Sequence, residues 1–575
     1  MMGRPKTLRD WLYAILFGTA VATLAWVWRF DAPPPELTEN LAVAAGLRPP
    51  EGPLGLHWQL LAGLLCRQFG LDAALGILHA GGCLALGGLA VLVLALFGWT
   101  LPWTLRRGEH VVAWWRRLVR FIIFQGAALF CLSYPVWNVF RWFSPSALQV
   151  MIAAAAALCC ILHIRTGRIG PLYASATIVG FLTADTPVGI VLHLLAIAGV
   201  AARNRMLGFG LFTVRADNPL VGVHVRSRLS MAFLGGAFLG AVLEVATFLA
   251  LDGLAALGWS LEEYACKLPI FYIKTLLATC SPAGVVILAA VVALPIFVEL
   301  KILVKATDDE KLLTYLHGAA FLVCGLVAFA QFAGMKSLWF WTWGGEHGCI
   351  RDDLIMCVAM CFCALSAMWS LAVFAFELKL RNLRRVTMLR FQDVSEITGV
   401  DEVLGTMKHV RRIVRTILLV EPFLVFASII PFRAQSLERA MLGVVADAAR
   451  ETVAECEGLK YLFTDGGLDA IVELQAARAG RRLYALSLMG GAADARDQYL
   501  RTREADDTGE RELLASGAAD ALRTWVRSRP DKADEYAVQI GFEVWRRDGL
   551  VTPECGGLVA RPGCFAPGER ERGAE

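Results

Sequence analysis

Long apolar stretches recur through the first three quarters of the chain and constrain its fold more than any other feature. A helix needs about 20 apolar residues to cross the hydrocarbon core of a membrane. About eleven stretches approach this length, and they lie at 10–29, 74–99, 119–138, 146–164, 170–184, 187–202, 231–256, 282–303, 312–334, 354–378 and 415–432. The composition agrees, because 57% of the 575 residues are hydrophobic and only 18% are charged. The sequence therefore predicts an α-helical polytopic membrane protein.

Basic residues predict the orientation of these spans, because cytoplasmic connections are enriched in Lys and Arg. Basic clusters such as Arg116-Arg117, Arg203 with Arg205, and Arg411-Arg412 fall in alternate connections. The N-terminus is then cytoplasmic, and the first loop (residues 30–73) lies on the outer side. We expect a bacterial inner-membrane protein in contact with the lipid bilayer. A net charge of +4 is too small for the basic surface of a nucleic-acid-binding protein, so no nucleic acid partner is expected.

Charged residues become frequent only after the last apolar stretch, so we expect two parts. Residues 1–432 form the membrane part, and residues 433–575 form a small extracytoplasmic α/β domain, which is periplasmic in this orientation. Strand-like stretches at 459–463 and 482–488 flank a helix that runs to about Ala479, which is a βαβ pattern.

Further features of the domain also lead to predictions. Asp465-Gly466-Gly467 stands directly before the predicted helix, where the free N–H groups of a helix start can bind an anion. The stretch 538–547 is predicted to be an amphipathic helix, and the tail beyond Pro567 is predicted to be disordered. Cys555 and Cys564 would face an oxidising compartment, where they could form a disulfide.

The first loop is predicted to contain two helices that lie at the membrane surface. Pro33, Pro34 and Pro35 precede an amphipathic stretch at 36–45, and a second helix begins around Leu54. The loop also carries groups suited to acid, base and anion-binding roles, namely Asp31, Glu36, Glu39, Arg48, Glu51 and His57.

Two segments resemble a bacterial family of multispanning membrane proteins related to protein O-mannosyltransferases. In the first loop, the resemblance rests on Glu36-Leu37, Gly46-Leu47, the string RPPEGPL at 48–54 and the Leu-rich helix after it. The segment YLFTDGGLD at 461–469 is similar to the TDGDND-like segment that opens the outer domain of that family. The chain differs from the pattern at Arg48, where the family has His, and at Pro33, where it has an acidic residue.

The resemblance implies a GT-C-like fold and a glycosyltransferase that uses a polyprenyl-phosphate sugar as donor. The acceptor would be a hydroxyl of a protein, lipid or glycan on the outer face. A carboxylate of the first loop, Glu36 or Asp31, would deprotonate this hydroxyl, and cationic groups would stabilise the departing phosphate. The candidates for substrate binding are Arg48, His57, Asp185, and His347 with Arg351 from the Trp-rich segment 335–353. No metal or further cofactor is expected.

Each of these candidates is also compatible with a structural role. Glu36 suits the first turn of a helix, where it complements the helix dipole. Arg48 could extend to lipid headgroups, and Asp185 is typical of the N-cap of the following span. The alternative function is therefore a non-catalytic membrane protein of this fold, which binds a glycan, a peptide or a partner through its outer domain.

Three acidic residues, Glu244, Glu299 and Glu421, fall within or at the ends of apolar stretches. An ionisable group inside a membrane is costly, so such residues are functional candidates by default. Glu244 is the most central of the three. His79, His163 and His317 show no metal-ligand spacing, and we expect them to pack in the helical core.

Overall fold

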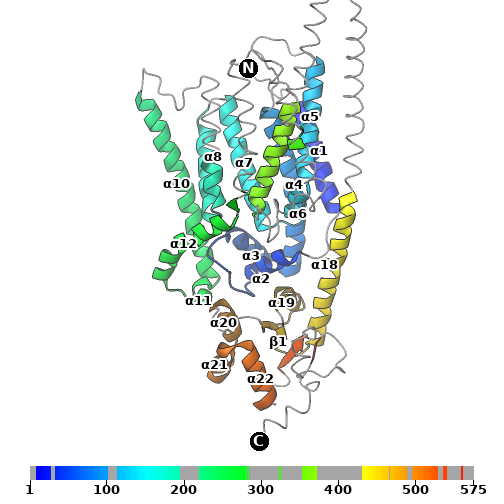
Figure 1. Cartoon of the computed structure of the whole chain (residues 1–575), viewed down its shortest axis with the longest axis vertical. Coiled ribbons are helices and arrows are strands. Elements are labelled where there is room, and N and C mark those ends of the chain that lie inside the picture. The colour runs from blue at the N-terminus through cyan, green and yellow to red at the C-terminus, as the bar shows by residue number, and fades with distance from the viewer. Residues whose placement is uncertain are drawn as a thin grey trace, which may run out of the picture.

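The computed structural model describes residues 8–27, 33–100, 113–166, 168–194, 219–279, 281–282, 284, 322, 324–325, 352–371, 430–464, 466–488, 495–528, 535–539 and 559–560. Helices dominate these residues, and one small sheet accompanies them. Figure 1 shows long helices side by side in the upper part, the first loop across their lower end, and the C-terminal domain below it.

Most helices of the upper part match the predicted apolar stretches. They are α1 (Leu8–Val27), α4 (Leu71–Thr100), α5 (Ala113–Cys131), α6 (Tyr134–Phe140), α7 (Pro145–Thr166), α8 (Gly170–Asp185) and α10 (Pro219–Ala250). Helix α11 (Gly253–Leu257) lies at the end of the predicted stretch 231–256, whereas α12 (Leu261–Thr279) lies in a segment for which the sequence indicated no span.

Four segments of the described chain are long and apolar enough to cross a membrane. They are Leu71–Gly98, Pro145–His163, Ser227–Ala250 and Asp353–Leu371, and α5 with α6 would make a fifth if this pair, bent by 60°, forms one span. The predicted spans at 282–303, 312–334 and 415–432 lie largely outside the described residues. The structure thus supports a membrane-associated helical protein with four or five candidate spans.

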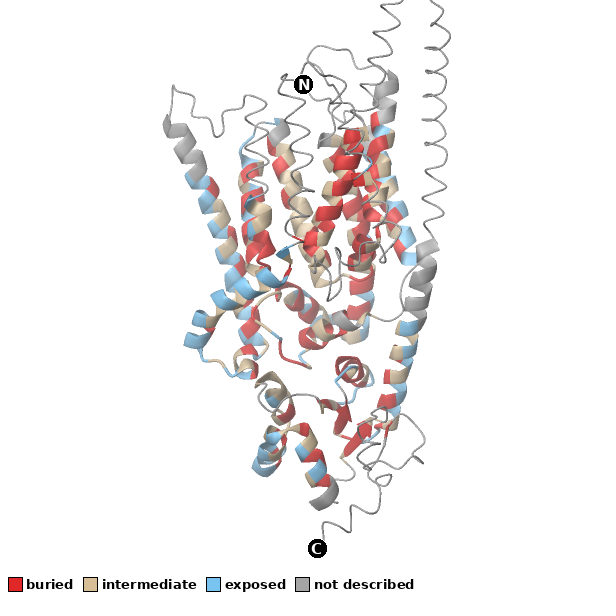
Figure 2. Cartoon of the chain, in the orientation of Figure 1, coloured by how far each residue is buried: buried red, intermediate tan, exposed pale blue. Residues whose placement is uncertain are grey.

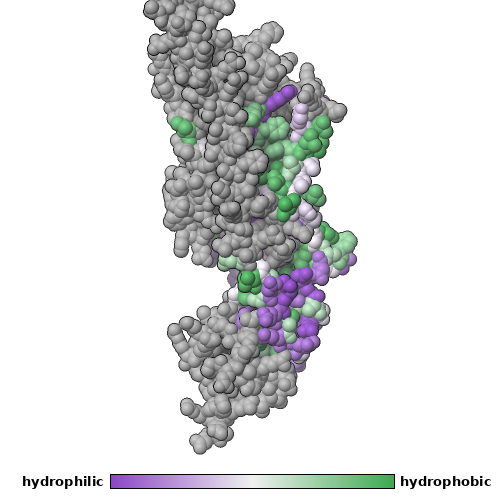
Figure 3. All heavy atoms as spheres, turned by 90° about the vertical axis from the view of Figure 1, so that its right-hand side faces the viewer, coloured by the Kyte–Doolittle hydropathy of each residue, from purple (hydrophilic) through white to green (hydrophobic). Residues whose placement is uncertain are grey.

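Burial and hydropathy show how these helices pack. Figure 2 shows many buried residues on α4 and on the helix at 353–371, and Phe97, Cys357 and Cys363 belong to their shared core. On the face seen in Figure 3, hydrophobic residues gather in the upper part and hydrophilic residues gather below, toward the domain. Large apolar side chains such as Leu12 and Ile15 of α1 are exposed, as expected for helices in contact with lipid.

Close approach of α8 and α10 depends on glycine. A Cβ atom on Gly180 would lie 2.1 Å from the carbonyl oxygen of Phe233, and one on Gly236 would lie 2.1 Å from that of Thr177. Small residues allow membrane helices to approach closely in this way. Gly236, Gly240 and Glu244 are spaced by four residues, which places Glu244 on the face of α10 that meets α8.

The first loop forms the two predicted helices, α2 (Pro35–Ala44) and α3 (His57–Phe69). Proline suits the first turn of α2, where its missing N–H group removes no helical bond. Leu41 and Trp58 of the loop are buried in one apolar cluster with Leu78 of α4 and Leu474 of the C-terminal domain. One cluster therefore joins the loop to both parts of the molecule.

The C-terminal domain begins with α18 (Ile430–Glu455) and contains four short strands. They are β1 (Tyr461–Thr464), β2 (Tyr484–Ser487), β3 (Tyr536–Gln539) and β4 (Val559–Ala560), in the order β2-β1-β3-β4. Strand β1 runs parallel to β2 and β3, while β4 is antiparallel to β3. The connection between β1 and β2 contains α19 (Asp469–Arg478), so the predicted βαβ unit is confirmed.

Helices cover both faces of this sheet, because successive strand residues point to opposite sides. Tyr461 and Phe463 pack with Trp525 of α22 (Ala518–Ser528). Leu462 packs on the other face with Val453 of α18 and with α19. Two further helices, α20 (Ala495–Thr502) and α21 (Thr508–Ser516), complete the described domain.

The helix predicted at 538–547 is wrong where the structure describes it, because residues 538 and 539 belong to strand β3. Val538 packs on one face of the sheet and Ala537 packs on the other. A strand buried on both faces shows no alternation of apolar and polar residues, so its pattern resembles that of a helix. The predicted disordered tail, and Cys555 with Cys564, lie outside the described residues.

Candidate functional site

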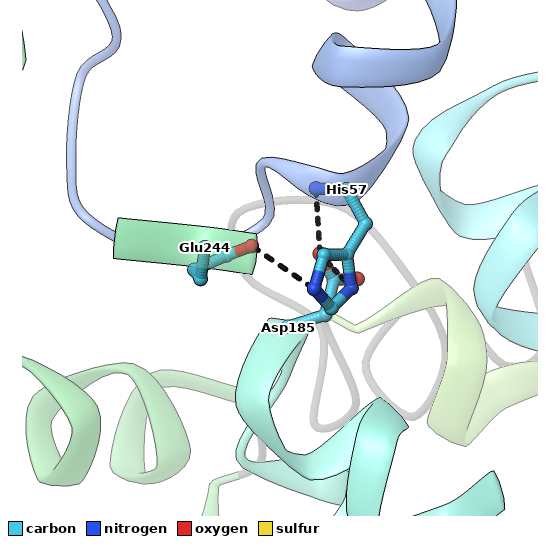
Figure 4. Close-up of side chains that lie close together, drawn as sticks. All are labelled: His57, Asp185 and Glu244. Atoms are coloured by element: carbon cyan, nitrogen blue, oxygen red, sulfur yellow. Dashed lines mark hydrogen bonds and ion pairs between the residues drawn. The ribbon is translucent and has the colours of Figure 1, made fainter. Parts of the chain in front are cut away.

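Three ionisable side chains meet where the first loop contacts the helical bundle (Figure 4). His57 is the first residue of α3, Asp185 is the last residue of α8, and Glu244 lies on α10. The His57 Nδ1 atom is 3.4 Å from Asp185 Oδ1, and His57 Nε2 is 3.4 Å from Glu244 Oε2. All three side chains are no more than 4% exposed.

The two carboxylates also bind the start of α3. The backbone N–H of Leu56 donates to Glu244 Oε1 at 2.9 Å, and that of His57 donates to Asp185 Oδ1 at 3.2 Å. The first N–H groups of a helix have no partner within the helix, and its dipole favours negative charge there. These two carboxylates therefore fix the start of α3 against two helices of the bundle.

Asp185 was also interpreted as the N-cap of the span that follows it, and this interpretation is wrong. Its Oδ1 atom accepts from His57, and its Oδ2 atom accepts from the Gln149 side chain at 2.8 Å. Asp185 therefore connects the first loop to α7 and α8. A residue from a distant segment supplies the N–H group that Asp185 caps, which sequence spacing does not reveal.

The imidazole ring of His57 is held from several sides. It stacks on Phe181, with ring centroids 4.4 Å apart, and its Nε2 atom lies 3.2 Å from the Gly240 carbonyl oxygen. Neither His57 Nδ1 nor Glu244 Oε2 has a hydrogen-bond partner among the described residues. The cluster therefore contains buried polar atoms that can still bind a proton or a ligand.

Arg48 belongs to a second cluster, between the first loop and the C-terminal domain. Its Nε atom lies 2.6 Å from Glu473 Oε2, its Nη1 atom 3.3 Å from Glu39, and its Nη2 atom 3.4 Å from Asp469. The side chain is 9% exposed, so the interpretation that Arg48 extends to lipid headgroups is wrong. Its predicted contact with a substrate phosphate stays a prediction, and its guanidinium group already faces three carboxylates.

The pKa values in this cluster reflect burial and charge together. Burial lowers the pKa of Arg48, but Glu473, Glu39 and Asp469 outweigh it, so the pKa lies above its ordinary value. Burial also raises the pKa of Glu473, and attraction to Arg48 offsets part of this rise. Arg48 and Glu473 are therefore each buried with the other as partner, and removal of either one would leave a buried charge without its partner.

Further arginines of the domain bind the first loop. Arg496 forms ion pairs with Glu39 and with Glu51, at 2.8 Å for the second pair. Arg503 donates to the Leu47 carbonyl oxygen at 3.0 Å. Among the described residues, Arg48, Arg496 and Arg503 thus dock the domain on the loop together with the apolar cluster around Leu474.

The predicted catalytic residues are placed only in part. Glu36 lies in the first turn of α2, and its side chain is outside the described residues, as are Asp31, His347 and Arg351. Among the residues missed from the sequence are Gln149, Asp469, Glu473 and Arg496. An acidic residue inside the apolar stretch of α19 could have indicated Glu473 as buried and paired. No protein-family model and no curated protein matches the sequence.

Proposed function

We propose that the chain is a membrane glycosyltransferase that moves a sugar from a polyprenyl-phosphate donor to an acceptor hydroxyl. The observation that carries this proposal is the buried His57, Asp185 and Glu244 cluster at the junction of the first loop and the helical bundle. Ionisable groups within apolar helices are costly and are mostly retained for function. The first loop, which supplies His57, is also one of the segments that resemble glycosyltransferases related to protein O-mannosyltransferases.

In this reaction, a carboxylate of the first loop, Glu36 or Asp31, takes the proton of the acceptor hydroxyl. The resulting oxygen attacks the anomeric carbon, and the bond between that carbon and the phosphate oxygen breaks. The electron pair leaves with the polyprenyl phosphate, whose charge requires a cationic partner. His347 and Arg351 are the candidates for this role, because Arg48 is already paired with Glu473.

The proposed orientation places the first loop and the C-terminal domain on the periplasmic side of a bacterial inner membrane. Two observations support it. Basic residues gather in the alternate connections, and the loop and the domain lie together at one end of the helices (Figure 1). A lipid-linked donor and a protein or glycan acceptor would both reach this end.

One observation favours the second candidate, a non-catalytic protein that binds a glycan, a peptide or a partner. Helix α19 contacts α2, and its Glu473 binds Arg48, one of the positions at which the first loop differs from the family pattern. In this case the loop is a docking platform for the domain, and the domain provides the binding surface.

Transfer of a labelled sugar from polyprenyl-phosphate donors tests the proposal in membranes that contain the full chain. The variants are Glu36→Gln and Asp31→Asn, and Glu262→Gln on an exposed position of α12 is the matched control. We expect transfer by the wild type and the control, and a loss of about 100-fold or more in one of the two loop variants. Absence of transfer by the wild type with all donors and acceptors would favour the second candidate.

A further inference from the structure

The donors and acceptors around His57, Asp185 and Glu244 leave acceptor atoms facing one another. Gly240 offers a carbonyl oxygen, which can only accept, so the His57 Nε2 atom beside it carries the proton. In a neutral imidazole, Nδ1 then presents a lone pair, and this lone pair faces the Asp185 oxygen 3.4 Å away. Two buried acceptors that face one another need a positive ion between or beside them.

From this arrangement we propose that His57, Asp185 and Glu244 bind one divalent transition-metal ion, of the Zn²⁺ or Mn²⁺ class. One ligand atom from each residue lies within 4.8 Å of the others. A neutral imidazole nitrogen and two carboxylate oxygens form a mixed donor set that suits these ions. His57 Nδ1 lies 3.4 Å from Asp185 Oδ1, and Glu244 Oε2 lies 3.4 Å from His57 Nε2. Neither His57 Nδ1 nor Glu244 Oε2 has a hydrogen bond among the described residues, so both can act as ligands.

The surroundings of the three side chains match those of protein metal sites. A histidine ligand usually donates its other ring N–H to a carbonyl or carboxylate, and ligating carboxylates are themselves hydrogen-bonded. Here Nε2 of His57 lies 3.2 Å from the Gly240 carbonyl, Glu244 Oε1 accepts from the Leu56 backbone, and Asp185 Oδ2 accepts from Gln149. Each ligand is therefore oriented before the ion arrives.

Three protein ligands leave at least one coordination position open. Structural zinc sites fill four positions with protein ligands, whereas catalytic sites keep one for water or substrate. The ion would also fix the first loop, because its ligands come from α3, α8 and α10. This inference concerns ion binding alone and does not depend on sugar transfer.

Direct binding measurements on the purified full chain test the proposal. The protein in detergent is treated with a chelator, exchanged into metal-free buffer and titrated with Mn²⁺, which is followed by the electron paramagnetic resonance of the free ion. Zn²⁺ is titrated in competition with a fluorescent chelator. We expect one ion per chain and a rise in the thermal unfolding midpoint when the ion is saturating.

Two variants remove a ligand oxygen with little change in shape, Glu244→Gln and Asp185→Asn. Glu244→Gln keeps an oxygen that can accept from Leu56, so the start of α3 stays bonded. We expect either variant to weaken binding by about 100-fold or more, since loss of a partner behind the ligand already costs about 10- to 100-fold. The control is His163→Gln, which changes a buried histidine on α7 whose Nδ1 atom contacts Arg168 and should leave binding unchanged.

If the variants fail to fold, the wild-type titration still decides the question. No stoichiometric ion and no rise in the thermal midpoint would overturn the proposal and leave a proton as the positive charge in the cluster. Binding that persists in both folded variants would also overturn it. If the wild type binds the ion but transfers no sugar with any donor, this result would count against the proposed function and not against this site.

Discussion

Two clusters of charged side chains hold the first loop, one around Arg48 and one around His57, and they are built in different ways. Around Arg48, each carboxylate that approaches has an arginine partner supplied by the loop or by the domain. Around His57, two carboxylates share one histidine, and polar atoms are left without hydrogen bonds among the described residues. The first cluster has the features of a docking contact, and the second has those of a ligand site.

The largest expected effect comes from Arg48→Met, which removes the cation of the docking cluster. Glu473 would remain buried without its partner, and breaking a buried ion pair in this way costs about 3–5 kcal/mol. Thermal unfolding of the purified chain should show a strongly lowered midpoint, and limited proteolysis should show release of the domain. A midpoint equal to that of the wild type would mean that the apolar cluster around Leu474 docks the domain without the ion pairs.

Gly236→Ala should break the His57 cluster while leaving the Arg48 cluster intact. The added Cβ atom would lie 2.1 Å from the Thr177 carbonyl oxygen, so α8 and α10 must separate. Overpacking of this kind costs about 1–3 kcal/mol, and it should move Asp185 away from Glu244. The matched control is Gly235→Ala, because a Cβ atom there meets nothing within 4 Å. Equal midpoints for the two variants would contradict the packing described for these helices.

The Arg48→Met penalty should depend on pH, because burial raises the pKa of Glu473 above its ordinary value of 4.5. A carboxyl group with a raised folded-state pKa favours folding below its unfolded pKa, and this contribution is lost as the pH rises through the folded pKa. Loss of Arg48 raises the pKa of Glu473 further, and each added unit costs about 1.4 kcal/mol once the group ionises. The difference in midpoint between wild type and variant should therefore be larger at pH 8 than at pH 5. Arg48→Met combined with Glu473→Gln should lose this dependence.

Glu244→Leu and Glu244→Gln separate the two roles of this residue. Leucine leaves the Leu56 N–H without an acceptor, which costs about 1–2 kcal/mol, whereas glutamine keeps an oxygen in place. We expect a lower thermal midpoint for the leucine variant, measured for both proteins without added metal. If both variants have the same thermal midpoint as the wild type, Glu244 does not hold the start of α3.

The smallest effect is expected for Arg478→Ala, which removes the ion pair with Asp72. Arg478 Nε lies 2.6 Å from Asp72 Oδ1, but the two side chains are 39% and 65% exposed. Exposed pairs contribute about 0–1 kcal/mol and are weakened by salt. Thermal unfolding at low and high ionic strength should therefore show little change, in contrast to Arg48→Met. A loss as large as that of Arg48→Met would mean that burial does not distinguish the contacts of the domain.

Local patterns in the sequence predicted several elements well. The apolar stretches predicted α4, α7, α10 and the helix at 353–371, and the proline and glycine positions predicted α2 and α3. The βαβ unit of the domain followed from its strand and turn residues. In contrast, residues 538 and 539 of β3 were predicted to begin a helix, because burial on both faces removes the alternation that marks a strand.

The functional residues also divide into those predictable from a local pattern and those that only tertiary contacts reveal. Glu244 was a candidate from the sequence because a lone carboxylate in an apolar stretch is costly wherever the helix lies. Its partners were not predictable, because His57 and Asp185 reach it only when the start of α3 meets the ends of α8 and α10. Arg48 was predicted to face a phosphate or lipid headgroups, and only the docked domain shows that Glu473 binds it. Periodicity and composition act within one segment, whereas charge pairing acts between segments that the fold brings together.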